Sequence, residues 1–82
     1  PLQASWKTLV IDAGRKDKLR PGDILGALTA NKQIESKDVG KIALFDTRSY
    51  VALHKTVADK ALQLLRKDKI KGRTFRVRLL AN

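Results

Sequence analysis

Residues 14–21 hold the densest cluster of side chains that could bind a charged ligand. The cluster contains four cations, which are Arg15, Lys16, Lys18 and Arg20. A short apolar run that ends at Ile11 precedes it, and its β-branched and aliphatic residues predict a buried strand. Pro21 follows it and is typical of the first position of a helix, where its fixed φ is favourable and its missing N–H is not needed. We therefore expect a basic loop, formed by these four cations, between a strand end and a helix start.

Such a loop suits the binding of a polyanion. Backbone N–H groups at the start of a helix attract anions, and the cationic side chains beside them add to that attraction. The whole chain carries 18 Lys and Arg against 8 Asp and Glu, a formal net charge of +10. This excess favours nucleic acid as a partner, and an anionic membrane surface second. The same residues could also form an ordinary solvated loop, and both interpretations stay open.

Hydrophobic periodicity predicts the elements that position these side chains. We expect strands at 6–12, 41–45, 48–53 and 73–80, and helices at 21–29 and from Thr56 to about Lys67. Thr56 and Asp59 have the spacing of a capping box for the second helix. The order β-α-β-β-α-β predicts an α+β, ferredoxin-like sandwich, with a four-stranded antiparallel sheet and both helices on one face.

The uncovered face of this sheet is the second candidate binding surface. Alternation along the strands assigns to it Val10, Ala43, Phe45, Arg48, Tyr50, Arg76 and Arg78. Aromatic rings and guanidinium groups on one face suit stacking on bases and contacts to phosphates. The RNA-recognition-motif fold usually carries aromatic residues on strands one and three, and here Val10 and Arg48 stand where two of them are expected. Phe45 either replaces a missing ring or is an edge residue covered by a loop.

A second basic cluster extends from the end of the second helix into the last strand. Its members are Arg66, Lys67, Lys69, Lys71, Arg73, Arg76 and Arg78, with Asp68 as the one acid between them. A run of charge is usually a solvated face. This one continues onto the sheet face beside Tyr50, which favours a role in binding.

The sequence contains no set of residues that suits catalysis or metal binding. The chain has no cysteine, which excludes disulfides and thiol catalysis. Its carboxylates are scattered, and His54 stands alone at an expected strand end. Neither a phosphate-cradling loop nor a dinucleotide fingerprint occurs. No apolar run is long enough to span a membrane, and we expect Trp6, the single tryptophan, to cap the core.

The length of 82 residues suits one domain. We expect 1–82 to be a single domain. Because the chain starts at Pro1 and contains no methionine, we also expect it to be a piece of a longer protein.

Three segments carry a resemblance to a known family. They read GRKDKLRPGDILGAL, VGKIALFDTRSYVAL and KGRTFRVRLL. Together they closely resemble the C-terminal RNA-binding domain of the DbpA family of bacterial DEAD-box ATP-dependent RNA helicases, over residues 8–80. The first segment is the most specific of the three.

The resemblance implies a bacterial, cytoplasmic RNA-binding module with no enzymatic activity of its own. It would tether the helicase core of the same chain to a structured hairpin of 23S ribosomal RNA during assembly of the large ribosomal subunit. The fragment would need no cofactor, while ATP and magnesium would belong to the helicase core of the parent protein. No membrane partner is implied.

The expected RNA contacts fall into two groups. The basic loop contributes Arg15, Lys16, Lys18 and Arg20. The sheet side contributes Lys41, Arg48, Tyr50, Arg73 and Arg76. Two other functions stay open, namely a ferredoxin-like protein-interaction domain with an acidic partner and a basic domain that binds nucleic acid without specificity. Steep salt dependence would separate nucleic acid from a neutral protein partner.

Overall fold

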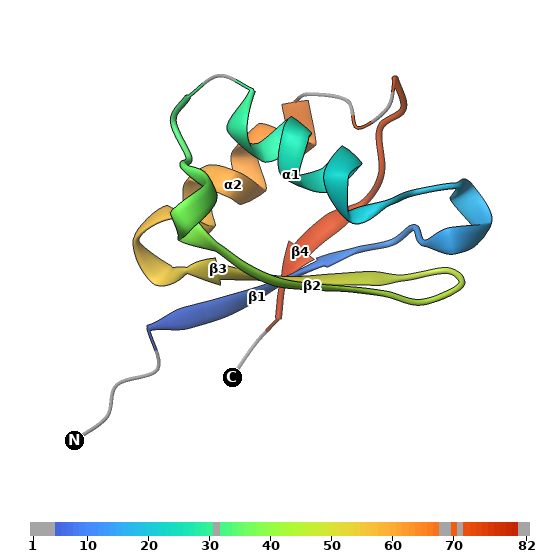
Figure 1. Ribbon diagram of the computed structural model, residues 1–82, viewed down its shortest axis with the longest axis horizontal. Coiled ribbons are helices and arrows are strands. Elements are labelled where there is room, and N and C mark those ends of the chain that lie inside the picture. Colours follow the sequence, from blue (N-terminus) through green and yellow to red (C-terminus); the bar gives the residue numbers. More distant parts are fainter. Residues whose placement is uncertain (1–4, 31, 68–69, 71, 81–82) are drawn as a thin grey trace.

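The computed structural model describes residues 5–30, 32–67, 70 and 72–80. Four strands and two α-helices follow one another in the order β1, α1, β2, β3, α2, β4 (Figure 1). Their bounds are β1 Trp6–Ile11, α1 Pro21–Thr29, β2 Val39–Leu44, β3 Ser49–His54, α2 Lys55–Lys67 and β4 Val77–Leu79. Two short 3₁₀ turns, Arg15–Asp17 and Ser36–Asp38, precede α1 and β2. This is the expected α+β order.

The strands form one antiparallel sheet in the order β2-β3-β1-β4. Tyr50 on β3 lies opposite both Ala43 on β2 and Val10 on β1, and Val10 lies opposite Arg78 on β4. Directly opposed residues point to the same side of a sheet. These four residues therefore form one row across the sheet, on the side away from the helices.

Both helices cover the other side of the sheet (Figure 1). The residues of β1 and β3 that point toward them are fully buried, namely Leu9, Ile11, Val51 and Leu53. A stripe of α2 packs onto them with buried Val57, Ala58, Ala61, Leu64 and Leu65. Removal of each large aliphatic side chain from water stabilises the fold by about 1.5–3 kcal/mol. The helices thus form the core with one sheet face and leave the other face open.

Most element ends differ from the sequence expectation by one or two residues, and the start of β4 differs by more. β4 begins at Val77 and not at residue 73, because the chain turns at Gly72, whose φ is 77°, and pairs with β1 only from Val77 onward. α2 begins at Lys55, directly after β3, and the expected Thr56–Asp59 capping box is replaced by a contact of His54. The Thr56 N–H donates to Nδ1 of His54 at 3.3 Å.

Neither α-helix in the described part of the chain has the length and apolar character that crossing a bilayer requires.

Candidate nucleic-acid interface

The basic loop is docked onto the turn that joins β2 to β3. The Arg15 N–H donates to the Phe45 carbonyl at 2.8 Å, and the Lys16 N–H donates to the Asp46 carbonyl at 2.9 Å. Gly14 makes this contact possible, because a Cβ atom there would overlap the carbonyl oxygen of Phe45. The loop is therefore a fixed part of the sheet end.

The acid within the loop holds the loop's own backbone. A carboxylate oxygen of Asp17 accepts the Gly14 N–H at 3.0 Å, and the other lies 3.7 Å from the guanidinium of Arg73. Lys18 closes the turn in the left-handed region, with φ 64°. Asp17 thus stabilises the turn that presents the cations.

The start of α1 already holds a carboxylate. Pro21 occupies the first helical turn, as expected, and Asp23 accepts the Arg20 N–H at 3.0 Å. An acid at this position satisfies a backbone donor and interacts favourably with the helix dipole. We therefore attribute anion attraction at this end of the sheet to the side chains of the loop.

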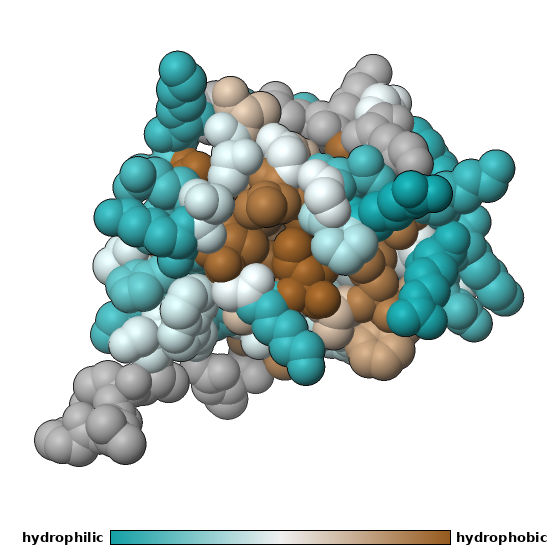
Figure 2. Space-filling view, viewed as in Figure 1, coloured by the Kyte–Doolittle hydropathy of each residue, from teal (hydrophilic) through white to brown (hydrophobic). Residues whose placement is uncertain are grey.

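All four cations of the basic loop have exposed side chains. Three of them, Arg15, Lys18 and Arg20, surround a shallow hollow of about 320 Å³ next to buried Leu19. Figure 2 shows hydrophilic side chains projecting at the end of the molecule where the loop and the β2–β3 turn lie, to the right in that view. The loop thus offers several positive charges to one ligand.

The centre of the open face has a second, smaller hollow. It measures about 130 Å³ and is lined by Val10, Asp12, Arg48, Arg76 and Arg78. Val10 is only 2% exposed and forms its apolar floor. Asp12 lies 3.8 Å from Arg48, and both side chains are about half exposed. Because exposed ion pairs contribute only about 0–1 kcal/mol, an incoming phosphate can compete for these guanidinium groups.

An aromatic pair lies beside this hollow. The rings of Phe45 and Tyr50 meet edge to face, with their centroids 5.7 Å apart and an interplanar angle of 80°. Together with Thr47 and Arg48 they line an open hollow of about 420 Å³. Phe45 is 55% exposed. It is therefore a second ring on the open face, and the alternative of an edge residue covered by a loop is wrong.

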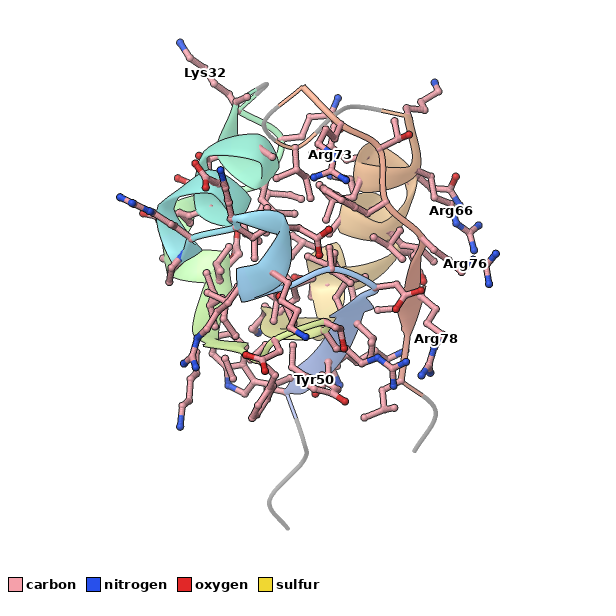
Figure 3. All side chains as sticks on the ribbon, turned by 90° about the vertical axis from the view of Figure 1, so that its right-hand side faces the viewer. Lys32, Tyr50, Arg66, Arg73, Arg76 and Arg78 are labelled. Atoms are coloured by element: carbon pink, nitrogen blue, oxygen red, sulfur yellow. The ribbon has the colours of Figure 1, made fainter. Side chains whose placement is uncertain are left out.

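One member of the expected sheet group lies elsewhere than its sequence position indicates, and another lies at the sheet edge. Arg73 precedes β4, contacts Asp17 and lies over the ring of Phe75, 5.0 Å from its centroid. It therefore belongs with the basic loop, and Figure 3 shows it apart from Arg76 and Arg78. Lys41 is exposed on the edge strand β2, where the register shifts between Val39 and Ile42.

The expectation that Trp6 caps the core is wrong. Trp6 is 45% exposed and pairs in register with His54. In β1 it alternates with Thr8 and Val10, so it lies on the open face. Alternation along the strand indicates this exposed position. The expectation of a core position rested instead on the large size of the indole side chain.

Three carboxylates in the described residues accept backbone hydrogen bonds. No group of three or more His, Cys, Asp or Glu in that part of the chain could hold a metal ion. Asp38, like Asp17 and Asp23, accepts a backbone N–H three residues earlier, that of Glu35 at 3.2 Å. Ser49, the one buried polar residue among those described, donates to the Ala13 carbonyl at 2.6 Å and ties β3 to the end of β1. The polar groups thus support the fold around two cationic surfaces.

The chain matches the sequence profile of a protein family and is similar to several known proteins. The sequence profile of the DbpA RNA binding domain matches residues 8–79. The chain is 52% identical to the ATP-dependent RNA helicase DbpA of Escherichia coli (strain K12) over 79 residues. This aligned segment makes up 96% of this chain and 17% of that protein. The chain is 36% identical over 70 residues to the ATP-dependent RNA helicase DeaD of Buchnera aphidicola subsp. Schizaphis graminum. That aligned segment makes up 85% of this chain and 12% of the relative.

A more distant relative is the ATP-dependent RNA helicase DbpA of Bacillus subtilis (strain 168). It is 26% identical over 69 residues, which cover 84% of this chain and 14% of that protein. The chain thus spans less than a fifth of the length of these relatives.

Proposed function

Since the chain belongs to the family of DbpA RNA-binding domains, we propose that it binds structured RNA through two adjoining surfaces. One is the basic loop, and the other is the open face of the sheet around Tyr50. The bound RNA lies across the end of the sheet where these two surfaces meet.

One observation carries this proposal. The backbone hydrogen bonds of Arg15 and Lys16 to the β2–β3 turn place the basic loop directly beside Phe45 and Arg48. The cations of the loop and the rings of the open face therefore form a continuous surface at one end of the sheet. A ligand with a regular line of charge and a few accessible bases suits both parts at once.

The two parts divide the work of recognition. The basic loop and Arg73 contact phosphates, which position an RNA without reading its sequence. The Phe45–Tyr50 pair stacks on a base that the RNA exposes outside its helical stem. The hollow above Val10, which is lined by three arginines, receives the phosphate or base edge next to the stacked base.

We further propose a hairpin of 23S ribosomal RNA as the target. The chain would tether the helicase core of a longer bacterial protein to this hairpin during assembly of the large ribosomal subunit in the cytoplasm. It has no catalytic role in this proposal, and ATP and magnesium act only in the helicase core. The resemblance of residues 14–28 and 39–53 to this family supports these assignments.

Salt dependence tests whether the ligand is a polyanion. If the chain contacts about five phosphates, the logarithm of the binding constant should fall against the logarithm of salt concentration with a slope near −3 to −5. The measurement is a titration of the chain with a labelled ribosomal hairpin at several salt concentrations.

A scrambled single strand of the same length serves as the control ligand. Equal affinity for both RNAs would indicate a basic domain that binds nucleic acid without specificity. A flat salt response would contradict the polyanion and favour a neutral protein partner.

A further inference from the structure

Three large apolar side chains are exposed among the described residues, and all of them lie on the open face. They are Trp6, Phe45 and Leu80, with exposed fractions of 45%, 55% and 42%. Trp6 alternates with Val10 on β1, and Phe45 contacts Tyr50. Leu80 donates its N–H to the carbonyl of Thr8. It lies two residues after Arg78, which is paired with Val10, and so points to the same face. All three therefore lie on the face to which the proposed function assigns the RNA.

Trp6 and Phe45 lie at opposite ends of this face. Trp6 is paired with His54 at one end of β3, and Phe45 contacts Tyr50 near the other end. Tyr50 and His54 are separated by four residues of one strand, which corresponds to about 13 Å. The proposed function uses the Phe45–Tyr50 end and leaves the Trp6 end without a role.

The indole ring of Trp6 is held in place although it is nearly half exposed. It meets the imidazole of His54 edge to face, with the centroids 5.7 Å apart and an interplanar angle of 75°. The ring lies so close to Gly40 that a Cβ atom there would be 3.2 Å from its Cζ3 atom. His54 is fixed in turn by the hydroxyl of Thr56, 2.8 Å from Nδ1. A ring fixed before binding loses little freedom when a base stacks on it.

We propose that the Trp6–His54 pair is a second base-stacking platform, which binds a single-stranded segment that continues from the structured RNA. This inference rests on the proposed function and extends it from a hairpin to a hairpin with an unpaired flank. The platform lies four residues from Val10 on β1 and four residues from Tyr50 on β3. It is thus separate from the positions where the RNA-recognition-motif fold is expected to carry its rings.

The floor between the two aromatic pairs suits an extended RNA strand. Thr8 and Ala52 lie opposite each other in the row between Trp6 and Val10, and neither has a bulky side chain. Arg78 borders the floor on the β4 side, where a phosphate can pass. A protein partner with an apolar segment would leave this guanidinium unpaired, so charge complementarity favours RNA.

The distance between the two platforms indicates how many nucleotides lie between the stacked bases. About 13 Å along the strand equals roughly four base steps at a stacked rise of 3.4 Å. Paired bases inside a duplex cannot stack on side chains, whereas unpaired bases can be splayed onto them. The occupant of the Trp6 end is therefore an unpaired segment of a few nucleotides.

The fluorescence of Trp6 tests this proposal directly, because the chain has one tryptophan. Two RNAs are compared, a blunt ribosomal hairpin and the same hairpin with an unpaired flank of about eight nucleotides, enough to cross both platforms. We expect only the flanked RNA to quench the Trp6 emission and to bind more tightly than the blunt one.

Variants separate stacking from general apolar contact. Trp6→Ala should reduce affinity for the flanked RNA by about 5- to 140-fold, the range for stacking of one base, and bring it to that of the blunt hairpin. Trp6→Phe keeps an aromatic face and should retain most of the affinity. Gln63→Ala removes an exposed side chain of α2, on the opposite side of the sheet, and should change little. Unfolding midpoints of all three variants verify that they fold.

Each contrary result has a defined meaning. If both RNAs bind equally, Trp6 emission does not change and Trp6→Ala binds like the wild type, the second platform is wrong while the proposed function stands. If neither RNA binds at low salt, the proposed function is wrong, and the platform with it. Quenching by an acidic peptide such as polyglutamate, but not by the flanked RNA, would overturn the platform in favour of a protein partner.

Discussion

The basic loop and the open sheet face present charge in different ways. In the loop, backbone hydrogen bonds to the β2–β3 turn and the carboxylate of Asp17 fix the chain, while the cationic side chains extend into solvent. On the open face, strand register places the side chains, and Arg48 already contacts Asp12. The loop therefore depends on backbone contacts for its position, whereas the face depends on alternation along the strands.

The difference separates stability from binding in each region. A change in a loop side chain removes a charge and leaves the fold intact, but a change in the loop backbone undoes its attachment to the sheet. On the open face the rings and guanidinium groups are also partly exposed, and the core lies on the other side of the sheet. Substitutions can therefore distinguish what positions the interface from what contacts the RNA.

The largest effect is expected from Gly14→Ala. The new Cβ atom would overlap the Phe45 carbonyl, so the loop must move away from the turn and lose the hydrogen bonds of Arg15 and Lys16. We expect the free energy of unfolding to fall by about 1–3 kcal/mol, the range for overpacking, and RNA affinity to fall with it. The measurements are a denaturant titration and a hairpin titration.

Gly26→Ala is the matched control for this change. Gly26 lies within α1, where an added Cβ atom would meet nothing within 4 Å. Replacement of an exposed helical glycine by alanine should stabilise the protein by about 1 kcal/mol and leave RNA binding unchanged. A Gly14→Ala protein as stable as the wild type would contradict the docked position of the loop.

The next largest effect is expected on the open face, from Tyr50→Ala. Loss of one stacking ring should weaken RNA binding by about 1–3 kcal/mol, with little change in the unfolding midpoint because the ring is partly exposed. A core position would behave differently, since large-to-small core changes cost about 3–5 kcal/mol in stability. Calorimetric titration and thermal unfolding of the same preparation distinguish the two. A marked drop in midpoint with unchanged affinity would move the binding surface away from β3.

Loop charges should have the next smaller effect. Arg15→Ala and Lys18→Ala should each weaken hairpin binding by about 1–2 kcal/mol, near the range for charge-assisted hydrogen bonds. Arg78→Ala should matter less, since Arg78 lies farther from the loop, along β4 (Figure 3). The affinities are compared at one salt concentration.

Lys37→Ala is the matched control for the loop variants. It removes an exposed cation in the second 3₁₀ turn that already lies 3.5 Å from Glu35. We expect it to bind like the wild type. If Arg78→Ala proves the most damaging and the loop variants match Lys37→Ala, the loop is a solvated charge run.

Local signals in the sequence were enough for much of the fold. Pro21 marked the start of α1, which spans the expected residues Pro21–Thr29. Alternation in β3 separated buried Val51 and Leu53 from Tyr50 on the open face. Such features depend on residues close together in the chain, so they can be predicted from the sequence alone.

Features that depend on distant residues were missed. The alternation from residue 73 onward predicts a longer β4, but β1 pairs with it only over Leu9–Ile11. Arg73 lies at the loop beside Asp17, a residue far from it in the sequence. The role of Gly14 depends on a carbonyl of the β2–β3 turn. None of these contacts leaves a local pattern.

The central claim is that the basic loop and the open face form one RNA-binding surface. Chemical-shift mapping of the labelled chain, with a ribosomal hairpin titrated in, tests it most directly. We predict that the amides of residues 14–18, 45–50 and 76–78 shift together along a single binding curve. Shifts confined to the exposed residues of α1 and α2, with the loop and the open face unchanged, would contradict the account.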